Sequence, residues 1–562
     1  MSTYKRAPVT APRLRGLPLR LFIETVEGPL GRGVLRKLVT DSGIEQWRNT
    51  PADASPVAPP LPHPQPLPEA DGDALSMAQR VVEGDSRANA SSDARSPETV
   101  AHFARAYREG RTTPVEVAER AIAAIAANRD MNWFIASDPK DVRAQAAASA
   151  KRLAEGRPLS IFDGVPVAVK DEMDQTPYPT TVGTRFLGEK PAVHDATLVR
   201  KLREAGALLV GKANMHEIGI NPIGLNTHYG AARNPWDKAR ITGGSSSGSA
   251  ASVAAGIVPV AIGADGGGSI RIPAALCGVV GLKATWGRIS EHGVFPLCWH
   301  VGHVGPIGQT VRDVAAAYAL IAGKDPYDDV SQHQPPVELA ALGRKDLKGV
   351  RLGIHRPWFE DADVDVVRRC QEAVAALVSA GAEVVEIGAP DLNTLLWTHA
   401  TIILSEMASS MLPHLKEHGG SHGLDVRANL AIGRYFSSTD YVHALRHRNK
   451  MTRELLATMK TVDAIITPTT ATTAPELPES ALPEGESNLQ MTDGLMRFIR
   501  AANVTGLPAL AVPAGYDAKS LPVSLHLMGR PWEEALLLRM GLEVERAMPR
   551  RTPPGAVRLL GT

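Results

Sequence analysis

Two glycine-rich runs place serines beside accessible backbone amides. The first is TGGSSSGSAASVAAG at residues 242–256, and the second is ADGGGSIRIP at residues 264–273. In the second run, three glycines precede Ser269, and consecutive amides without side chains can form a concave nest for negative charge. A hydroxyl beside such a nest suits acyl transfer, because the amides can stabilise the oxyanion of a tetrahedral intermediate. A phosphate-binding loop or a plain turn explains this run as well.

A serine nucleophile needs a base, and Lys170 is the candidate. Serine is a weak nucleophile alone, and none of the 17 histidines lies in a recognisable triad context. Lys170 ends the apolar run VPVAVK, so we expect its stem in apolar surroundings, which favour the neutral amine. Taken alone, Lys170 fits better with another interpretation, a surface lysine paired with Asp171 or Glu172.

The loop at 242–249 offers hydroxyls that can relay a proton between Lys170 and Ser269. Ser247 and Ser249 are explained equally well as caps of the Ala-rich helix that follows. Capping leaves Ser245 and Ser246 unexplained, so these two are the candidates for a relay.

From about residue 97, short apolar runs alternate with helical patterns, and Lys170 and the second glycine run lie at the ends of such runs. The alternation predicts an α/β fold with a large mixed sheet covered by helices on both faces, in which functional groups collect at strand ends. Ser96-Pro97 and Thr113-Pro114 are typical of helix starts, and helices are expected from residue 270 and over 363–381. Strands are expected at 163–171, 206–214, 258–269, 349–356, 382–390, 462–470 and 508–516.

Residues 1–50 are predicted to form an amphipathic helical segment, broken at Gly28-Pro29. Either this segment straps onto the main body or a dimer partner, which we favour, or residues 13–40 lie on a membrane surface. Residues 51–96 are expected to be a Pro-rich and polar linker, followed by the catalytic domain at 97–562. The apolar positions at helical spacing are Leu19, Phe22, Ile23, Val26, Leu30, Val34 and Leu38, and the basic residues are Arg20, Arg32, Arg36 and Lys37.

Composition excludes several classes of protein. The chain has 562 residues, with 61 Lys+Arg against 60 Asp+Glu, so no net field favours nucleic acid. Its three cysteines are far apart, which indicates no disulfide framework and a reducing compartment. No apolar run approaches the roughly 18 residues that span a bilayer, and no secretory signal is recognisable. We therefore expect a cytoplasmic protein, with peripheral membrane contact through 13–40 as the alternative.

The flanks of these candidate residues resemble the amidase signature family. The matching segments are GVPVAVKD, TGGSSSGSAA and GADGGGSIRIPAALCGVVGLK, together with LVGKANMHE, RNPWD, GLKATWGR, HVGPIGQT and DAIITPTT, so the resemblance spans roughly 97–548. It implies that Ser269 is the nucleophile and that Ser245, after a cis peptide bond, bridges to Lys170. It also implies an oxyanion hole of Gly266, Gly267, Gly268 and the Ser269 amide. Supporting roles fall to Gly244, Ser246, Ser247 and Arg271, and no metal or cofactor is implied.

Within this family, the chain is most similar to the plant-type fatty acid amide hydrolases. The segments that carry this are GKANMHEIGI, GADGGGSIRIPAALCG, NLQMTDGLMRFIRAANVTGLPALAVPAGY and LMGRPW. The resemblance implies hydrolysis of lipophilic N-acyl amides such as N-acylethanolamines through an acyl-enzyme, and we expect a homodimer. Three alternatives remain: an amidase of another branch acting on aryl amides, carbamates or esters, a subunit of a glutamine-dependent transamidation complex, and a nucleotide-binding protein. Neither loop has the G-x-x-x-x-G-K-[ST] pattern of the last class.

An apolar stripe near the C-terminal end is a candidate wall for the acyl chain. Its members recur at near-helical spacing, and methionine and phenylalanine suit adaptable apolar pockets. Packing in the protein core explains the stripe equally well. The residues are Met491, Leu495, Met496, Phe498, Ile499 and Ala502.

Overall fold

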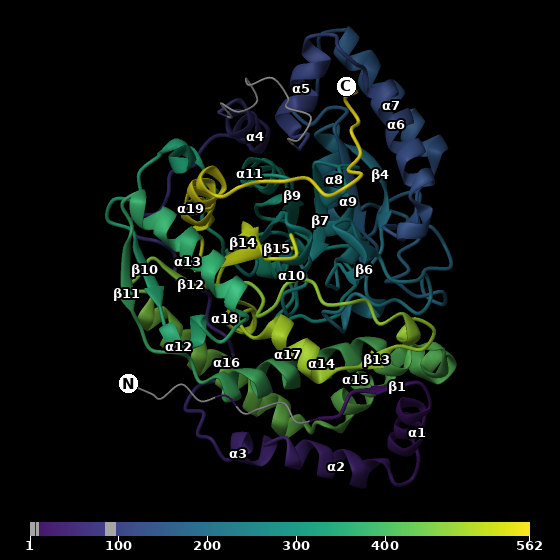
Figure 1. Cartoon of the computed structure of the whole chain (residues 1–562), viewed down its shortest axis with the longest axis vertical. Coiled ribbons are helices and arrows are strands. Elements are labelled where there is room, and N and C mark those ends of the chain that lie inside the picture. Colours follow the sequence, from purple (N-terminus) through teal and green to yellow (C-terminus); the bar gives the residue numbers. More distant parts are fainter. Residues whose placement is uncertain (1–5, 7–10, 85–96, 562) are drawn as a thin grey trace.

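An eleven-stranded mixed sheet runs through the computed structural model, which describes residue 6 and residues 11–84 and 97–561 (Figure 1). Several of its strands are buried at every position, which requires helices on both faces. The predicted α/β fold with a large mixed sheet is therefore confirmed. In spatial order the strands are β11 (Glu383–Glu386), β10 (Arg351–Ile354), β12 (Ala464–Pro468), β15 (Pro522–Gly529), β14 (Ala509–Tyr516), β8 (Val280–Lys283), β9 (Val304–Gly308), β7 (Val260–Ala264), β3 (Pro166–Lys170), β4 (Leu208–Ala213) and β2 (Phe134–Ala136).

The register of the sheet brings the candidate residues to one edge. Strand β3 is parallel to both neighbours, with Val169 opposite Ile262 of β7 and Lys170 opposite Ala213 of β4. Because parallel strands end at the same edge, Lys170 lies beside the glycine loop that follows β7. The sheet thus positions the base candidate and the nucleophile candidate without any long connection between them.

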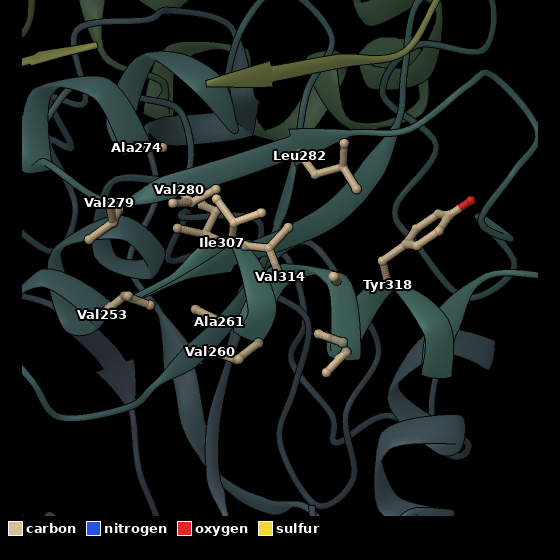
Figure 2. Packing of buried hydrophobic residues seen from close by; sticks show 14 of the residues in the cluster. Val253, Val260, Ala261, Ala274, Val279, Val280, Leu282, Ile307, Val314 and Tyr318 are labelled. Carbon is tan, nitrogen blue, oxygen red and sulfur yellow. The ribbon is translucent and has the colours of Figure 1, made fainter. Parts of the chain in front are cut away.

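The core around these strands is built from aliphatic side chains. Figure 2 shows Val260 and Ala261 of β7 packed with Val280 of β8 and Ile307 of β9. Helices α9 (Ser247–Ala254) and α11 (Val311–Ile321) contribute further buried residues to the same cluster. The strands that end at these candidate residues are consequently supported by a continuous hydrophobic core.

All seven predicted strands are present, as β3, β4, β7, β10, β11, β12 and β14. The helices expected at 363–381 and from residue 270 are α13 (Val364–Ser379) and α10 (Arg271–Cys277), and Thr113-Pro114 begins α6 (Pro114–Ala127). The helix start at Ser96-Pro97 is wrong for Pro97, and Ser96 lies outside the described residues. Helix α5 (Val100–Arg108) begins three residues later because the Thr99 side chain caps the amide of His102.

The segment predicted as a linker contains a helix. Residues 51–68 form neither helix nor strand, as expected, but α4 (Ala74–Glu83) follows and packs against α11. Met77, Val81 and Val82 of α4 are buried in the main core cluster. The linker prediction therefore does not hold for residues 74–83, which belong to the packed body.

The N-terminal segment forms α1 (Gly16–Glu27), α2 (Gly31–Asp41) and α3 (Ile44–Arg48), broken at Gly28-Pro29 as predicted. In Figure 1 these helices run along the lower edge of the molecule. Leu19, Ile23, Val26 and Leu35 pack against α15 (Leu424–Tyr435) in one cluster. Most of the apolar stripe is thus covered by the same chain, whereas Leu30 is exposed.

The remaining helices surround the sheet and frame the site. Two two-stranded sheets complete the fold, β1 (Leu14–Arg15) with β13 (Glu486–Ser487) and β5 (Arg233–Asn234) with β6 (Asp237–Ile241). The helices not yet named are α7 (Pro139–Ala154), α8 (Thr197–Glu204), α12 (Arg356–Phe359), α14 (Leu392–His418), α16 (Ser438–Thr458), α17 (Leu489–Met496), α18 (Arg500–Thr505) and α19 (Glu534–Ala547).

Candidate active site

Lys170 is buried and its amine reaches a serine hydroxyl. The side chain is 1% exposed, and Nζ donates to Ser245 Oγ at 2.9 Å. The Glu172 carboxylate also lies close, with Oε2 2.5 Å from Nζ. The pairing with Glu172 that we considered for a surface lysine is present, but it lies in the interior. A buried amine between a hydroxyl and a carboxylate is placed for proton exchange rather than for solvation.

Ser245 follows a cis peptide bond, and the residue before it, Gly244, has no room for a side chain. The Gly244–Ser245 bond is cis, as the family resemblance implies. A Cβ on Gly244 would lie 2.8 Å from both the Cα and the N of Gly224, so only glycine fits. The Ser245 carbonyl accepts from the amide of His216 at 3.0 Å. The backbone on both sides of Ser245 is therefore held in place.

The other serines of this loop tie helix α9 to the sheet instead of capping it. Ser246 Oγ donates to the carbonyl of Ala264 at 3.1 Å, and Ser249 Oγ donates to that of Ile262 at 3.0 Å. Ser247 Oγ donates to the carbonyl of Asn214 at 3.2 Å. Helix α9 has no side-chain cap, so the capping interpretation of Ser247 and Ser249 is wrong.

The loop of Ser269 lies beside the loop of Ser245, because a backbone hydrogen bond joins them. The Ser246 amide donates to the Ser269 carbonyl at 3.3 Å. The glycines before Ser269 are sterically required. A Cβ on Gly267 would lie 2.8 Å from Met496 Cε, and one on Gly268 would lie 2.5 Å from Ile499 Cγ2.

Asp265 and Arg271 fix the base of the glycine loop. Arg271 donates to both carboxylate oxygens of Asp265, at 2.9 and 3.0 Å, and to Asn503 Oδ1 at 2.6 Å. Burial alone would raise the pKa of Asp265, but the charge and hydrogen bonds of Arg271 outweigh it and hold this pKa well below its usual value. The bracing role expected for Arg271 thus has a specific target, which sequence reasoning missed.

The Asp265 carboxylate also binds one of the four amides predicted for the oxyanion hole, that of Gly268. The Gly268 amide donates to Asp265 Oδ1 at 2.7 Å, so this N–H is already engaged. The amides of Gly266, Gly267 and Ser269 have no hydrogen-bond acceptor in the part of the chain that the structure describes. Three of the four expected donors are consequently free to meet a ligand.

His399 of α14 is a further contact of this loop that the sequence did not reveal. Its Nε2 lies 2.8 Å from the Gly266 carbonyl oxygen. Burial lowers the pKa of His399 to about 4, so the ring is neutral at neutral pH. No local motif marks this histidine, since it comes from a helix more than a hundred residues later in the chain.

The apolar stripe proposed as an acyl wall is divided by a break between α17 and α18. Phe498 lies in this break and packs against Trp358 in a core cluster, so its assignment to the wall is wrong. Leu495 and Ile499 are fully buried against Ile272. A single helical projection fails here because the chain is not one helix. Met491 and Met496 are only partly buried, and they remain candidates.

Neither a metal cluster nor a membrane-spanning helix occurs among the described residues. No group of three or more His, Cys, Asp or Glu side chains in this part of the chain is arranged to hold a metal ion. Within the same residues, none of the helices is both long and apolar enough to cross a membrane. The three cysteines, Cys277, Cys298 and Cys370, are all free thiols.

Comparison with known proteins identifies relatives of this site and fold. The family model "Amidase" matches residues 116–538. The chain is 39% identical to a fatty acid amide hydrolase of Arabidopsis thaliana, over 97% of this chain and 94% of that protein. It is 34% identical to a subunit of the glutamyl-tRNA(Gln) amidotransferase of Chloroflexus aggregans, over 80% of this chain and 96% of that one. The structure of a peptide amidase from Stenotrophomonas maltophilia superposes with a TM-score of 0.71, at 28% identity over 82% of this chain and 98% of that one.

Proposed function

The chain belongs to the amidase family, whose members are also called amidase signature enzymes, and from this premise we propose that it hydrolyses lipophilic N-acyl amides such as N-acylethanolamines. The observation that carries the proposal is the contact of buried Lys170 with Ser245 beside the loop of Ser269. The similarity to plant fatty acid amide hydrolases extends over nearly the whole chain and so includes most of the N-terminal segment. It supports the lipophilic substrate class.

The proposed chemistry is acyl transfer through a serine ester. Lys170 accepts a proton through Ser245 from the Ser269 hydroxyl, and the Ser269 oxygen attacks the amide carbon. The amides of Gly266, Gly267 and Ser269 stabilise the oxyanion that forms. The C–N bond then breaks, and the relay returns the proton to the leaving amine. Water repeats the sequence on the ester, which releases the carboxylic acid and restores Ser269.

Apolar side chains around the nucleophile loop favour a hydrocarbon chain beside the reacting carbonyl. A Cβ placed on Gly266 would lie 2.9 Å from Cys298 Sγ and 3.2 Å from Ile403 Cδ1, and Met496 reaches the position of Gly267. These groups offer no charge for a polar acyl substituent such as that of glutamine. The similarity to the amidotransferase makes glutamine the natural competing substrate.

A series of N-acylethanolamines with increasing chain length tests the substrate class. Burial of each additional CH₂ stabilises by about 0.8 kcal/mol, so kcat/KM should rise by up to about fourfold per CH₂ until the site is filled. Glutamine and aryl amides should be turned over far more slowly, and Ser269→Ala should be inactive on every substrate. A rate independent of chain length, or a preference for glutamine or an aryl amide, would contradict the proposal.

A further inference from the structure

Helix α14 supplies one side chain that reaches the nucleophile loop with a hydrogen bond. His399 is 3% exposed, and its Nε2 lies 2.8 Å from the carbonyl oxygen of Gly266. Its Cε1 lies 2.9 Å from the position that a Cβ on Gly267 would take. The ring therefore packs directly against the Gly266–Gly267 peptide.

The proton on His399 can be assigned from its partner. Burial lowers the pKa of His399 to about 4, so at neutral pH the ring carries one N–H. The Gly266 carbonyl can only accept, so the hydrogen of this contact belongs to Nε2. His399 is thus a neutral donor that holds a carbonyl, and it is not placed as a general base.

When His399 binds the Gly266 carbonyl, it also determines the direction of the Gly267 N–H. The C=O of Gly266 and the N–H of Gly267 belong to one planar trans peptide and point in opposite directions. Glycine on both sides allows this peptide to rotate freely unless a hydrogen bond holds it. When His399 binds the carbonyl on the α14 side, the Gly267 N–H is directed away from α14.

The rest of the loop is fixed by other groups, which leaves this peptide to His399. Asp265 accepts from the Gly268 amide at 2.7 Å, and its own amide donates to the carbonyl of His303 at 2.7 Å. No acceptor for the Gly267 N–H occurs among residues 11–84 and 97–561. Of these groups, only His399 binds the carbonyl of the Gly266–Gly267 peptide.

The face of α14 that carries His399 is itself anchored nearby. Glu406, about two turns further along, accepts from the amides of Trp299 and His300 at 2.7 and 3.1 Å. Ile403 lies between the two on the same face and approaches Gly266. The helix is therefore held against the loop around Cys298 as well as against the glycine loop, so the position of the His399 ring is well defined.

We propose that His399 is a positioning residue that orients the Gly266–Gly267 peptide so that the Gly267 amide can donate to the oxyanion. This role rests on the proposed acyl transfer at Ser269. Asp265 holds the Gly268 amide, and His399 holds the Gly266 carbonyl. His399 acts on the transition state through the amide it orients and takes no part in proton transfer.

Substitutions that separate the N–H of His399 from its volume test the proposal. His399→Phe keeps a ring without the donor, His399→Leu removes both, and His399→Gln keeps an N–H donor. With a short soluble N-acylethanolamine, the Phe and Leu variants should lose about 10- to 100-fold in kcat, with KM within about threefold of wild type. His399→Gln should recover most of this loss. A trifluoromethyl ketone, which forms an oxyanion when Ser269 adds to it, should bind the Phe and Leu variants more weakly by the factor lost in kcat/KM.

Ile402→Val is the matched control, because it removes buried volume from the neighbouring position of α14, on the side that faces the N-terminal helices. Its kcat should stay within about twofold of wild type. The inference is overturned if the folded Phe or Leu variant keeps its kcat, if Gln is as impaired as Phe, or if only KM changes. Two donor-free variants ensure a result if one fails to fold. Absence of wild-type turnover on every amide would instead contradict the proposed function itself.

Discussion

Lys170 and Lys212 are both buried lysines, but their amines have different partners. They lie at the ends of neighbouring parallel strands, β3 and β4, with Val169 opposite Lys212 in the register. Both are buried, with 1% and 0% of each residue exposed. Both also end an apolar run in the sequence, so Lys212 meets the same sequence criterion for a desolvated base as Lys170.

The two lysines differ in what their amines reach. Lys170 Nζ donates to the hydroxyl of Ser245, a group that can both accept and donate a proton. Lys212 Nζ donates to the carbonyl of Met173 at 2.5 Å and to the Thr180 hydroxyl at 3.5 Å, and it lies 3.4 Å from Asp171 Oδ1. Burial lowers the pKa of Lys212 against the opposing charge of Asp171. Lys170 also pairs with the Glu172 carboxylate, so a carboxylate neighbour is common to both lysines. Their hydroxyl partners differ in position: Ser245 lies in the loop next to that of Ser269, whereas Thr180 belongs to the segment after β3 that Lys212 holds in place.

Burial of a strand-end lysine therefore does not identify a catalytic base. Lys283, the last residue of β8, is also fully buried, and its Nζ donates to the carbonyl of Ala284 at 3.0 Å. What separates Lys170 from both is the hydroxyl partner next to a nucleophile. Substitutions at Lys170, at Lys212 and in the serine loop test this distinction.

The largest effect is expected from exchanging each lysine for methionine. Lys170→Met should lower kcat/KM for amides by a factor of about 10² or more, as for loss of a general base. Lys212→Met leaves Asp171 buried without its partner, so the free energy of unfolding should fall by about 3–5 kcal/mol. Amide turnover per folded molecule should then stay within a few-fold of wild type.

Kinetics at a temperature where both variants are folded, together with denaturant unfolding, separate the two outcomes. Equal loss of turnover in Lys212→Met and Lys170→Met would contradict the claim that the contact with Ser245 gives Lys170 a role that Lys212 lacks. A Lys170→Met enzyme within a few-fold of wild type would make Lys170 a structural residue like Lys212.

The serines of the first loop give the next effect. Ser245→Ala removes the hydroxyl that Lys170 reaches and should lower kcat by about 10², since it interrupts the proton path. Ser247→Ala removes only a hydrogen bond to the Asn214 carbonyl, so it should cost about 1 kcal/mol of stability and leave kcat nearly unchanged. Steady-state kinetics and melting curves on both variants provide the check. Similar kcat losses in the two would mean that the loop acts as a structural unit.

The N-terminal helices are expected to stabilise the fold without contacting Lys170, Ser245 or Ser269. Leu19, Ile23, Val26 and Leu35 are buried on α15, and full burial of each is worth about 1.5–3 kcal/mol. Deleting residues 1–50 should lower the melting temperature and reduce turnover of short and long amides by the same factor. Selective loss of long-chain turnover, with weaker flotation on anionic liposomes, would instead support membrane contact through residues 13–40.

Local sequence patterns were sufficient for the central elements of the fold, whereas the contact between Lys170 and Ser245 was expected from the family resemblance. The strands were recognisable because they are short, continuously apolar and end in glycine or charged residues. Family motifs identified Ser245 and Ser269 because these serines lie in glycine loops whose backbone admits no side chains. Strands β2, β8, β9 and β15 of the large sheet were missed, since their apolar runs are short or contain prolines and polar residues.

The features of the site that sequence analysis missed or misassigned depend on tertiary contacts. His399 approaches Gly266 across 133 positions, and no periodicity within α14 marks it. The family resemblance implied that Gly268 belongs to the oxyanion hole, but the carboxylate of Asp265, three residues earlier, accepts from its amide. Phe498 was misassigned because the break between α17 and α18 cannot be seen from hydrophobic spacing.

Covalent labelling of Ser269 tests the central claim most directly. A fluorophosphonate should form one Ser269 Oγ–P bond with release of fluoride, which intact-mass measurement detects as a single adduct. We predict one adduct on wild type and on Lys212→Met, much slower labelling of Lys170→Met, and none on Ser269→Ala. An adduct that persists on Ser269→Ala, or labelling of Lys170→Met at the wild-type rate, would contradict the account.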